Sequence, residues 1–367
     1  FGSRRLGSWR GRTRCKKPAA MSAASTSPAL SPDLSVLQPA LDVMRRFPCK
    51  EPPPPATASE AEPSDFQGQI MSEDLQFGLL KAPDRTAADL FAMTDADMLA
   101  MRLECARFGL LCFRGVQDMT AESFGTFMAK WGPIDRDYKP TDLDPTAPSD
   151  VAPSILGNGG EGETLLVSPM WHFDGDTAPC LHRYTSLFCV KPPFVGHPTG
   201  FAAANRAVGH LPSELLAWLE GAFAQYSECE IVEAENPDHA ASTDDYGPQL
   251  KPILRRHKEF GTLLPPALVI YGKRERILLR DGTVLDKESS RALSDALEAF
   301  VTQPCFQYMM PWEANTLLVW DDQVLLHAVV PYDTNAFRRK MWRLTIREKE
   351  EMPVPPLVAR AQQGTSQ

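Results

Sequence analysis

The stretch 168–184, SPMWHFDGDTAPCLHRY, holds four side chains that can bind a metal: His172, Asp174, Asp176 and His182. In an extended segment, side chains two residues apart leave the backbone on the same face, so His172 and Asp174 can share one ion. Because two ligands alone bind a divalent ion weakly, the pair requires a third ligand from elsewhere in the chain. The spacing of Asp176 and His182 favours substrate contacts or neighbouring roles over metal binding.

His327 is the best candidate for the third ligand. It follows the run LLVWDDQVLL and precedes AVVPY, at the end of a predicted strand. A histidine in such surroundings is more often a core residue than a ligand, and an HxD pair also occurs by chance. Taken together, however, two histidines and one carboxylate form the facial triad of non-haem Fe(II) oxygenases. That triad leaves three coordination positions open, which suits O2 and a bidentate co-substrate.

A dianionic co-substrate also needs a cation at its far end, and Arg343 is placed to supply one. In the run RRKMWRLTIRE, alternation puts Met341, Arg343 and Thr345 on one face of a predicted strand. A guanidinium between bulky apolar neighbours is expected to be partly buried and to need an anion. The anion is either a resident Asp or Glu or a ligand carboxylate, and the presence of the triad favours the ligand.

These motifs resemble the taurine dioxygenase family of Fe(II)- and 2-oxoglutarate-dependent oxygenases. The resemblance covers about residues 77–347 and rests on GLLCFRGVQDMTAESFGTFMAKWGPI, WHFD, GHPTGF and LLVWDDQVLLHAVVPY with the later RRKMWR. It implies that His172, Asp174 and His327 bind the iron.

The same resemblance implies how the co-substrate is held and which fold holds it. Arg343 would bind the distal carboxylate of 2-oxoglutarate, Thr199 would hydrogen-bond the same molecule, and Arg339 would support it. The implied fold is mainly β with flanking helices (α+β), a double-stranded β-helix or jelly roll. With Fe(2+), 2-oxoglutarate and O2, such an enzyme releases succinate and CO2 and oxidises, typically hydroxylates, a C–H bond of a small molecule.

Several positions depart from the pattern of the taurine-specific enzymes. Asp135 and Asp137 stand where those enzymes have a histidine for the sulfonate, and Ser168 replaces an asparagine. Because a carboxylate would repel a sulfonate, taurine is not the expected substrate; alternatively, the two aspartates belong to a solvated loop. The GHPT segment also carries His197 and Pro198 where GGDT is common.

Two other classes of protein remain open. One is a degenerate oxygenase fold that only binds a ligand, and the intact triad with Arg343 argues against it. The other is a Zn-dependent hydrolase, which would need a further ligand at short spacing. His182 is the residue available for that role.

The elements that must carry these residues can be predicted from periodicity and capping signals. Apolar spacing, with Thr94 and Thr120 as N-caps and glycines as stops, predicts alternating helices and strands. The expected helices are 94–108, 120–131, 213–223 and 287–301. The expected strands are 110–115, 184–190, 266–272, 276–285 (turning at Asp281-Gly282), 315–320 and 341–348.

The composition of the chain narrows the classes of partner that the protein is expected to bind. The net charge is −9 although residues 1–20 hold seven basic groups and no acidic one, so the rest of the chain is strongly acidic and should repel nucleic acid. Without an apolar run of about 18 residues, no membrane span is expected. The eight cysteines form no CxxC pair and are expected to be buried free thiols. A small-molecule substrate is the expected partner, and a homo-oligomer is left open.

The chain ends differ in composition from the centre. Residues 1–70 are basic and then proline-rich, so they are expected to form a disordered or targeting segment. An oxygenase domain is expected over 71–350 and a disordered tail over 351–367. The expected location is cytoplasmic, or organellar if the basic N-terminus is a transit peptide.

Overall fold

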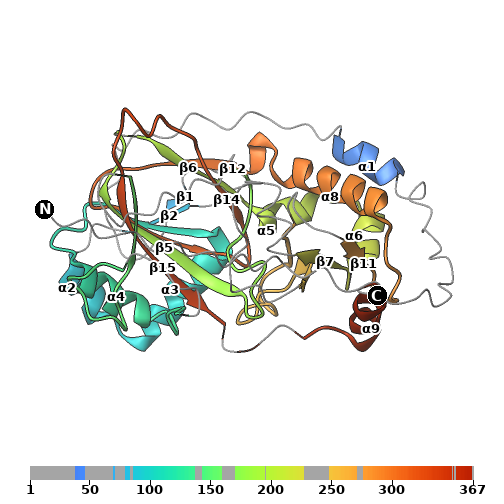
Figure 1. Cartoon of the computed structure of the whole chain (residues 1–367), viewed down its shortest axis with the longest axis horizontal. Coiled ribbons are helices and arrows are strands. Elements are labelled where there is room, and N and C mark those ends of the chain that lie inside the picture. The colour runs from blue at the N-terminus through green and yellow to red at the C-terminus, as the bar shows by residue number, and fades with distance from the viewer. Residues whose placement is uncertain are drawn as a thin grey trace, which may run out of the picture.

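In a computed structural model of the chain, the described residues are 38–45, 69–70, 79–82, 86–136, 143–158, 170–194, 196–226, 248–270, 276–348, 350 and 353–365. Sheets fill the middle, and helices gather at its two ends (Figure 1). Asp137 and Ser168, which the sequence marked as substrate contacts, lie outside the described residues. None of the described helices is both long and apolar enough to cross a bilayer.

Among the described residues, the largest sheet has seven strands and carries Arg343 of the predicted site. Its order is β1 (Gln69–Ile70), β2 (Leu79–Ala82), β3 (Leu110–Phe113), β13 (Leu317–Asp321), β5 (His182–Lys191), β15 (Lys340–Arg347) and β4 (Ser154–Gly157). Every pair is antiparallel except β2 with β3. The predicted strands at 184–190, 315–320 and 341–348 are therefore confirmed as its central members.

A second sheet of three strands packs against the first. Its order is β12 (Gln307–Pro311), β6 (Pro198–Ala202) and β14 (Leu326–Val329), all antiparallel. One buried cluster joins the two sheets, with Leu187 and Met341 from the larger and Phe201, Tyr308 and Met310 from the smaller. Since apolar area removed from water stabilises by about 25 cal/mol per Å², this core holds the sheets face to face.

Three helices cover the other face of the large sheet: α2 (Ala87–Ala92), α3 (Asp95–Phe108) and α4 (Ala121–Ala129). They begin at Thr86, Thr94 and Thr120, whose hydroxyls accept the backbone N–H three residues on, as capping boxes do. Figure 1 shows them gathered at one end of the molecule. The predicted helices at 94–108 and 120–131 are confirmed, the second ending two residues early.

The other end holds the described residues between β6 and β12. They form α5 (Ala204–Ala207), α6 (Ser213–Leu219), α8 (Lys287–Val301), two 3-10 turns (Val208–His210 and Pro304–Phe306) and five short strands. These strands are β7 (Phe223–Tyr226), β8 (Gln249–Pro252), β9 (Leu254–Arg255), β10 (Ala267–Leu268) and β11 (Arg276–Leu278). Their shared core includes Ala202 of β6 and Leu326 of β14, so this end is continuous with the small sheet. The helix predicted at 287–301 has the bounds of α8.

Three expectations about the elements need correction. The helix predicted over 213–223 stops at Leu219, because Gly221 has a φ of 75° and Phe223 already starts β7. The strand predicted over 266–272 is reduced to the two residues of β10. The strand predicted over 276–285 is reduced to β11 (Arg276–Leu278), although the turn predicted at Asp281-Gly282 is present, since Gly282 has a φ of 87° and Leu279 N–H donates to Thr283 O.

The expected disorder at the chain ends does not hold for two helices. Helix α1 (Gln38–Arg45) buries Leu41 and Met44 in the core that α8 also lines. Helix α9 (Pro356–Thr365) buries Val358 against β7 and β11. Both helices use apolar residues that are spaced on one face, a signal that proline-rich flanks obscure.

Candidate metal and co-substrate site

His172 and His327 are brought together by their backbones. His172 lies in the loop before β5 and forms an isolated antiparallel bridge with His327 of β14, through N–H···O hydrogen bonds of 3.0 and 2.8 Å. Directly opposed residues in such a pair have neighbouring side chains. The two imidazole centroids are consequently only 4.2 Å apart, although the residues are distant in sequence.

Asp174 completes the group that the sequence predicts. Its Oδ1 lies 4.0 Å from His172 Nε2 and 3.8 Å from His327 Nε2. One ligand atom from each of the three residues lies within 4.8 Å of the others, and this is the cluster of its kind found among the described residues. Alternation along the extended segment places His172 and Asp174 on one side, as expected.

Both imidazoles are prepared to bind a cation through Nε2. His172 Nδ1 lies 2.8 Å from the carbonyl oxygen of Met170, so Nδ1 carries the proton and Nε2 keeps its lone pair. Burial, with His172 alongside, lowers the pKa of His327 to about 3. His327 is therefore neutral near pH 7, the form in which histidine is a metal ligand.

The second oxygen of Asp174 is held by the protein. Arg343 Nη2 lies 2.6 Å from Asp174 Oδ2, and Thr185 Oγ1 lies 2.7 Å from the same atom. Burial opposes the charge of Asp174, but Arg343, His327 and His172 outweigh it and hold the pKa of that carboxyl well below its ordinary value. Asp174 is therefore an anion with Oδ1 turned toward the two histidines.

The position of Arg343 differs from the expected one. Its partner is a resident carboxylate, the alternative that the sequence argument ranked second. A five-carbon diacid that chelates a metal at one end puts its other carboxylate several bonds away. Arg343 instead lies in direct contact with a triad residue, Asp174.

Arg339 precedes β15 and is four residues from Arg343, a separation of at most about 13 Å along a fully extended chain. It is 5% exposed, and burial lowers the pKa of its guanidinium while Tyr332 and Cys189 oppose that shift. Its guanidinium carbon lies 6.0 Å from the centre of the Tyr332 ring.

Thr199 lies at the same end of the small sheet as Arg339. It pairs with Val329, two residues beyond the level of His327, and its hydroxyl accepts a 2.8 Å hydrogen bond from Trp312 Nε1. His197, two residues earlier, stacks edge-on at 4.9 Å against the same Tyr332 that Arg339 contacts. The altered GHPT turn thus keeps Thr199 buried and near the second arginine.

His182, Asp135 and Asp176 do not form a metal site. His182 Nε2 lies 2.7 Å from Asp135 Oδ2, and both side chains are less than 10% exposed. Asp135 is therefore not in a solvated loop, and its Oδ2 contacts His182 inside the protein. Burial raises the pKa of Asp176 to about 7. Neither His182 nor Asp176 belongs to the described metal cluster, which removes the support for a hydrolytic zinc site.

Sequence reasoning missed the buried polar residues behind the triad. Thr185 Oγ1 lies 2.7 Å from Asp322 Oδ2 as well as from Asp174, and Arg255 donates to the carbonyl oxygen of Asp322 over 3.1 Å. Arg255 also stacks on Phe173 at 4.3 Å. Burial and the nearby Asp174 raise the pKa of Asp322 well above its ordinary value. Adjacent acids inside an apolar run, as in LLVWDDQVLL, were the available signal.

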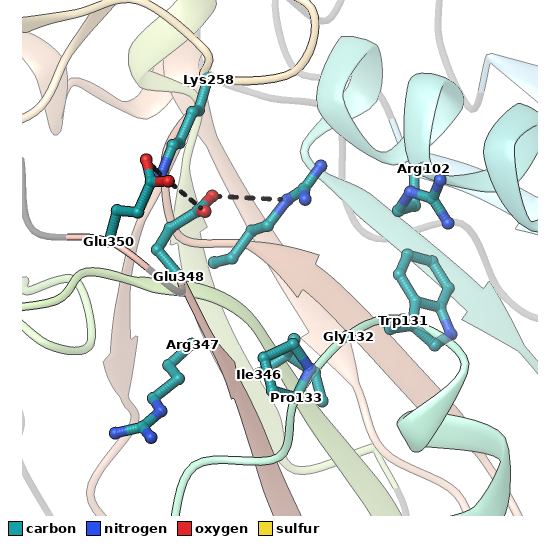
Figure 2. Close-up of a pocket in the computed structure, with 10 residues that line it drawn as sticks. Arg102, Trp131, Gly132, Pro133, Lys258, Ile346, Arg347, Glu348 and Glu350 are labelled. Carbon is teal, nitrogen blue, oxygen red and sulfur yellow. Dashed lines mark ion pairs between the residues drawn. The ribbon is translucent and has the colours of Figure 1, made fainter.

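A cavity of about 410 Å³ lies away from the triad, at the end of β15. Figure 2 shows that charged side chains line it, with Lys258 paired to Glu348 and Glu350 at 3.2 and 3.7 Å. Arg183 also pairs with Glu348 at 3.7 Å, and Arg102 pairs with Glu259 at 3.2 Å. None of the triad residues lines this cavity, and three of its cations, Arg102, Arg183 and Lys258, have resident acids as partners.

Five of the eight cysteines fall within the described residues, and all five are free thiols. Cys105, Cys112, Cys189 and Cys305 are buried, while Cys180 is half-buried. The expectation of buried free thiols is thus confirmed for these four.

Fold and site together define a class: a mixed helix and sheet protein with two facing sheets and a His-Asp-His cluster suited to a non-haem metal ion. The profile described as "Taurine catabolism dioxygenase TauD, TfdA family" matches residues 73–345. The chain belongs to this family. It is accordingly an Fe(II)- and 2-oxoglutarate-dependent dioxygenase, which uses O2 as co-substrate.

Relatives and a solved structure support this placement. The chain is 25% identical over 274 residues to the (S)-phenoxypropionate/alpha-ketoglutarate-dioxygenase of Sphingobium herbicidovorans, covering 71% of this chain and 90% of that one. It is 24% identical over 267 residues to an alpha-ketoglutarate-dependent 2,4-dichlorophenoxyacetate dioxygenase of a Burkholderia species, covering 69% and 86%. The crystal structure of AAD-2 with Mn(II) and N-oxalylglycine superposes with a TM-score of 0.61 at 18% identity, covering 76% and 97%.

Proposed function

We propose that the enzyme hydroxylates a C–H bond of a small carboxylate, with Fe(II) held by His172, Asp174 and His327. The observation that carries this proposal is that the two carboxylate oxygens of Asp174 have different neighbours. Oδ1 faces both histidine Nε2 atoms, whereas Arg343 and Thr185 contact Oδ2. A carboxylate fixed in this way presents one oxygen to an ion. The two sheets around it would form a double-stranded β-helix.

The donor set suits iron. Two neutral imidazoles and one carboxylate are the ligands of the facial triad, and they leave positions open for a chelating co-substrate and O2. When bound, the metal supplies the oxidation chemistry that couples decarboxylation of 2-oxoglutarate to attack on a C–H bond. The protein supplies geometry and charge: Met170 fixes the tautomer of His172, and Arg343 keeps Asp174 ionised.

We assign the distal carboxylate of 2-oxoglutarate to Arg339 and Thr199, in place of Arg343. Arg339 lies just before β15, four residues N-terminal to Arg343. It is near the end of the small sheet where Thr199 is buried. A buried guanidinium grips a carboxylate through two parallel hydrogen bonds, and a hydroxyl adds a third. This assignment gives the distal carboxylate a buried cation that is not in contact with Asp174.

Arg343 is then available to a substrate anion next to the metal. A guanidinium has five N–H donors, so Arg343 can hydrogen-bond Asp174 and a second carboxylate at the same time. Two relatives are named for (S)-phenoxypropionate and 2,4-dichlorophenoxyacetate, which are both aryloxyalkanoates with one carboxylate. Aryloxyalkanoates are therefore the first substrate class to test.

The test measures succinate release from 2-oxoglutarate with Fe(II) and O2, with and without candidate substrates. Phenoxypropionate or a related aryloxyalkanoate should stimulate release above the uncoupled rate and yield a product with one added oxygen. Taurine and an uncharged aryl ether of equal size serve as controls. Stimulation by the uncharged ether to the same extent would contradict the carboxylate assignment, and no succinate release under any condition would contradict the enzyme function.

A further inference from the structure

Asp322 is a buried carboxylate in the turn between β13 and β14, directly behind the triad. Its side chain is 0% exposed, and three donors surround it. Oδ1 accepts hydrogen bonds from Trp320 Nε1 at 3.0 Å and from the backbone N–H of Asp174 at 3.3 Å. Oδ2 lies 2.7 Å from Thr185 Oγ1, and that hydroxyl lies 2.7 Å from Asp174 Oδ2 as well, so it bridges the two acids.

Asp322 also faces the second ligand-bearing segment. His327 Nδ1 lies 3.8 Å from Asp322 Oδ1 and makes no hydrogen bond within the part of the chain that the structure describes. A histidine that binds metal through Nε2 carries its proton on Nδ1, and that N–H is usually directed at a carboxylate or carbonyl. The Asp322 side chain therefore contacts both ligand-bearing segments. It reaches Asp174 through the Asp174 backbone N–H and through the Thr185 hydroxyl, and it lies next to Nδ1 of His327.

The adjacent acid, Asp321, has the same burial but different neighbours. Its side chain is also 0% exposed, and its Oδ2 lies 2.8 Å from His257 Nε2. Its Oδ1 accepts the backbone N–H of Gln323 at 2.9 Å. Asp321 thus supports the turn and the β8–β10 region, and it provides a matched control for a change at Asp322.

We infer that Asp322 is a positioning residue that holds Asp174 and His327 at the separation one divalent ion requires, with Thr185 as the link. This inference rests on the proposed function, because it presumes that the triad binds metal. Residues that orient metal ligands without touching the metal typically contribute about 10- to 100-fold to affinity. Here the carboxyl group is hydrogen-bonded to the backbone of Asp174 and lies 3.8 Å from His327 Nδ1, so one group is in reach of both ligand-bearing segments.

The test is a Co²⁺ titration of the full-length metal-free protein, followed by visible absorption, since Co²⁺ is stable to air and its bands report ligand geometry. Asp322→Asn keeps the shape but replaces one oxygen with a donor, and it should weaken Co²⁺ binding about 10- to 100-fold and shift the absorption bands. Asp321→Asn should bind Co²⁺ as the wild type does. Thermal unfolding of each variant is measured alongside.

A second pair of variants keeps the inference testable if Asp322→Asn does not fold. Thr185→Val removes the linking hydroxyl and should weaken Co²⁺ binding, whereas Thr185→Ser keeps the hydroxyl and should restore it. Equal affinities for Asp322→Asn and Asp321→Asn, or wild-type binding by Thr185→Val, would overturn the inference while leaving the proposed function intact. A wild-type protein that binds no Co²⁺ would instead overturn the proposed function itself, and the inference with it.

Discussion

Arg343 Nη2 lies 2.6 Å from Asp174 Oδ2, so one oxygen of a metal-binding carboxylate is neutralised by an arginine that a sequence argument assigns to the co-substrate. The pairing explains why the pKa of Asp174 is held well below its ordinary value despite burial. It also separates the duties of two arginines that lie four residues apart. Under the proposed function, Arg343 acts at the triad and Arg339 binds the far end of the co-substrate.

This separation predicts opposite kinetic effects for two similar substitutions. Arg339→Met should raise the KM for 2-oxoglutarate by about 10- to 100-fold, because a hydrogen bond between charged groups contributes about 1.5–3 kcal/mol. Arg343→Met should change that KM little and should raise the KM for a carboxylate substrate. Succinate release at varied 2-oxoglutarate, with and without substrate, distinguishes them. The reverse pattern would restore the sequence-based assignment of Arg343.

The triad itself predicts loss of metal with loss of any one ligand. His172→Ala, Asp174→Ala and His327→Ala should each abolish iron binding and succinate release, since two remaining ligands bind a divalent ion weakly. Iron content after reconstitution and dialysis measures the effect. His182→Ala is the control, because His182 is bonded to Asp135 and lies outside the cluster. If His182→Ala lost its iron while His327→Ala kept it, the ligand set would be wrong.

Local patterns were sufficient to predict that His172 and Asp174 share one side, and to predict the longest helices and the central strands. The two-residue spacing of His172 and Asp174 needs only strand alternation, and the helices at α3, α4 and α8 carry their own caps. Gly221 was a readable stop signal for α6 that the apolar periodicity outweighed. The co-substrate arginine could not be settled in this way, because alternation puts Arg339 and Arg343 on the same face and only tertiary contacts separate them.

The residues behind the triad depend on long-range contacts. Thr185 contacts Asp174 and Asp322, but the three residues lie in three different segments, and no spacing rule in the sequence links them. A single hydroxyl in YTSLFCV reads as an ordinary strand residue. The sequence does show that burying the two acids of LLVWDDQVLL would cost free energy unless each finds hydrogen-bond donors. This identifies the two acids as candidates for a functional role, but it does not identify their partners.

His197 predicts a pH dependence of stability. Burial lowers its pKa below the ordinary 6.5, and Arg339 adds to the effect, so the folded protein binds fewer protons than the unfolded chain. Its contribution is therefore complete above pH 6.5 and is lost as the pH falls below that value. Urea unfolding at several pH values should show a shallower pH dependence for His197→Gln than for the wild type. Parallel curves for the two proteins would contradict the assignment.

The close packing around Gly125 predicts that no larger residue is tolerated at this helix position. It lies inside α4, where Gly→Ala ordinarily stabilises by about 0.5–1 kcal/mol. Here a Cβ would lie 1.9 Å from the carbonyl oxygen of Val151, which is backbone and cannot move aside like a flexible side chain. We therefore expect Gly125→Ala to destabilise the protein by about 1–3 kcal/mol, as overpacking does.

Urea unfolding measures this effect, and Gly209→Ala is the matched control, because a Cβ at Gly209 meets no atom within 4 Å. Gly209→Ala should leave stability nearly unchanged. A Gly125→Ala protein as stable as the wild type would show that α4 and the segment before β4 can separate without cost. Since β4 pairs with β15 beside Arg343, such freedom would also remove the rigid support that the metal site is argued to need.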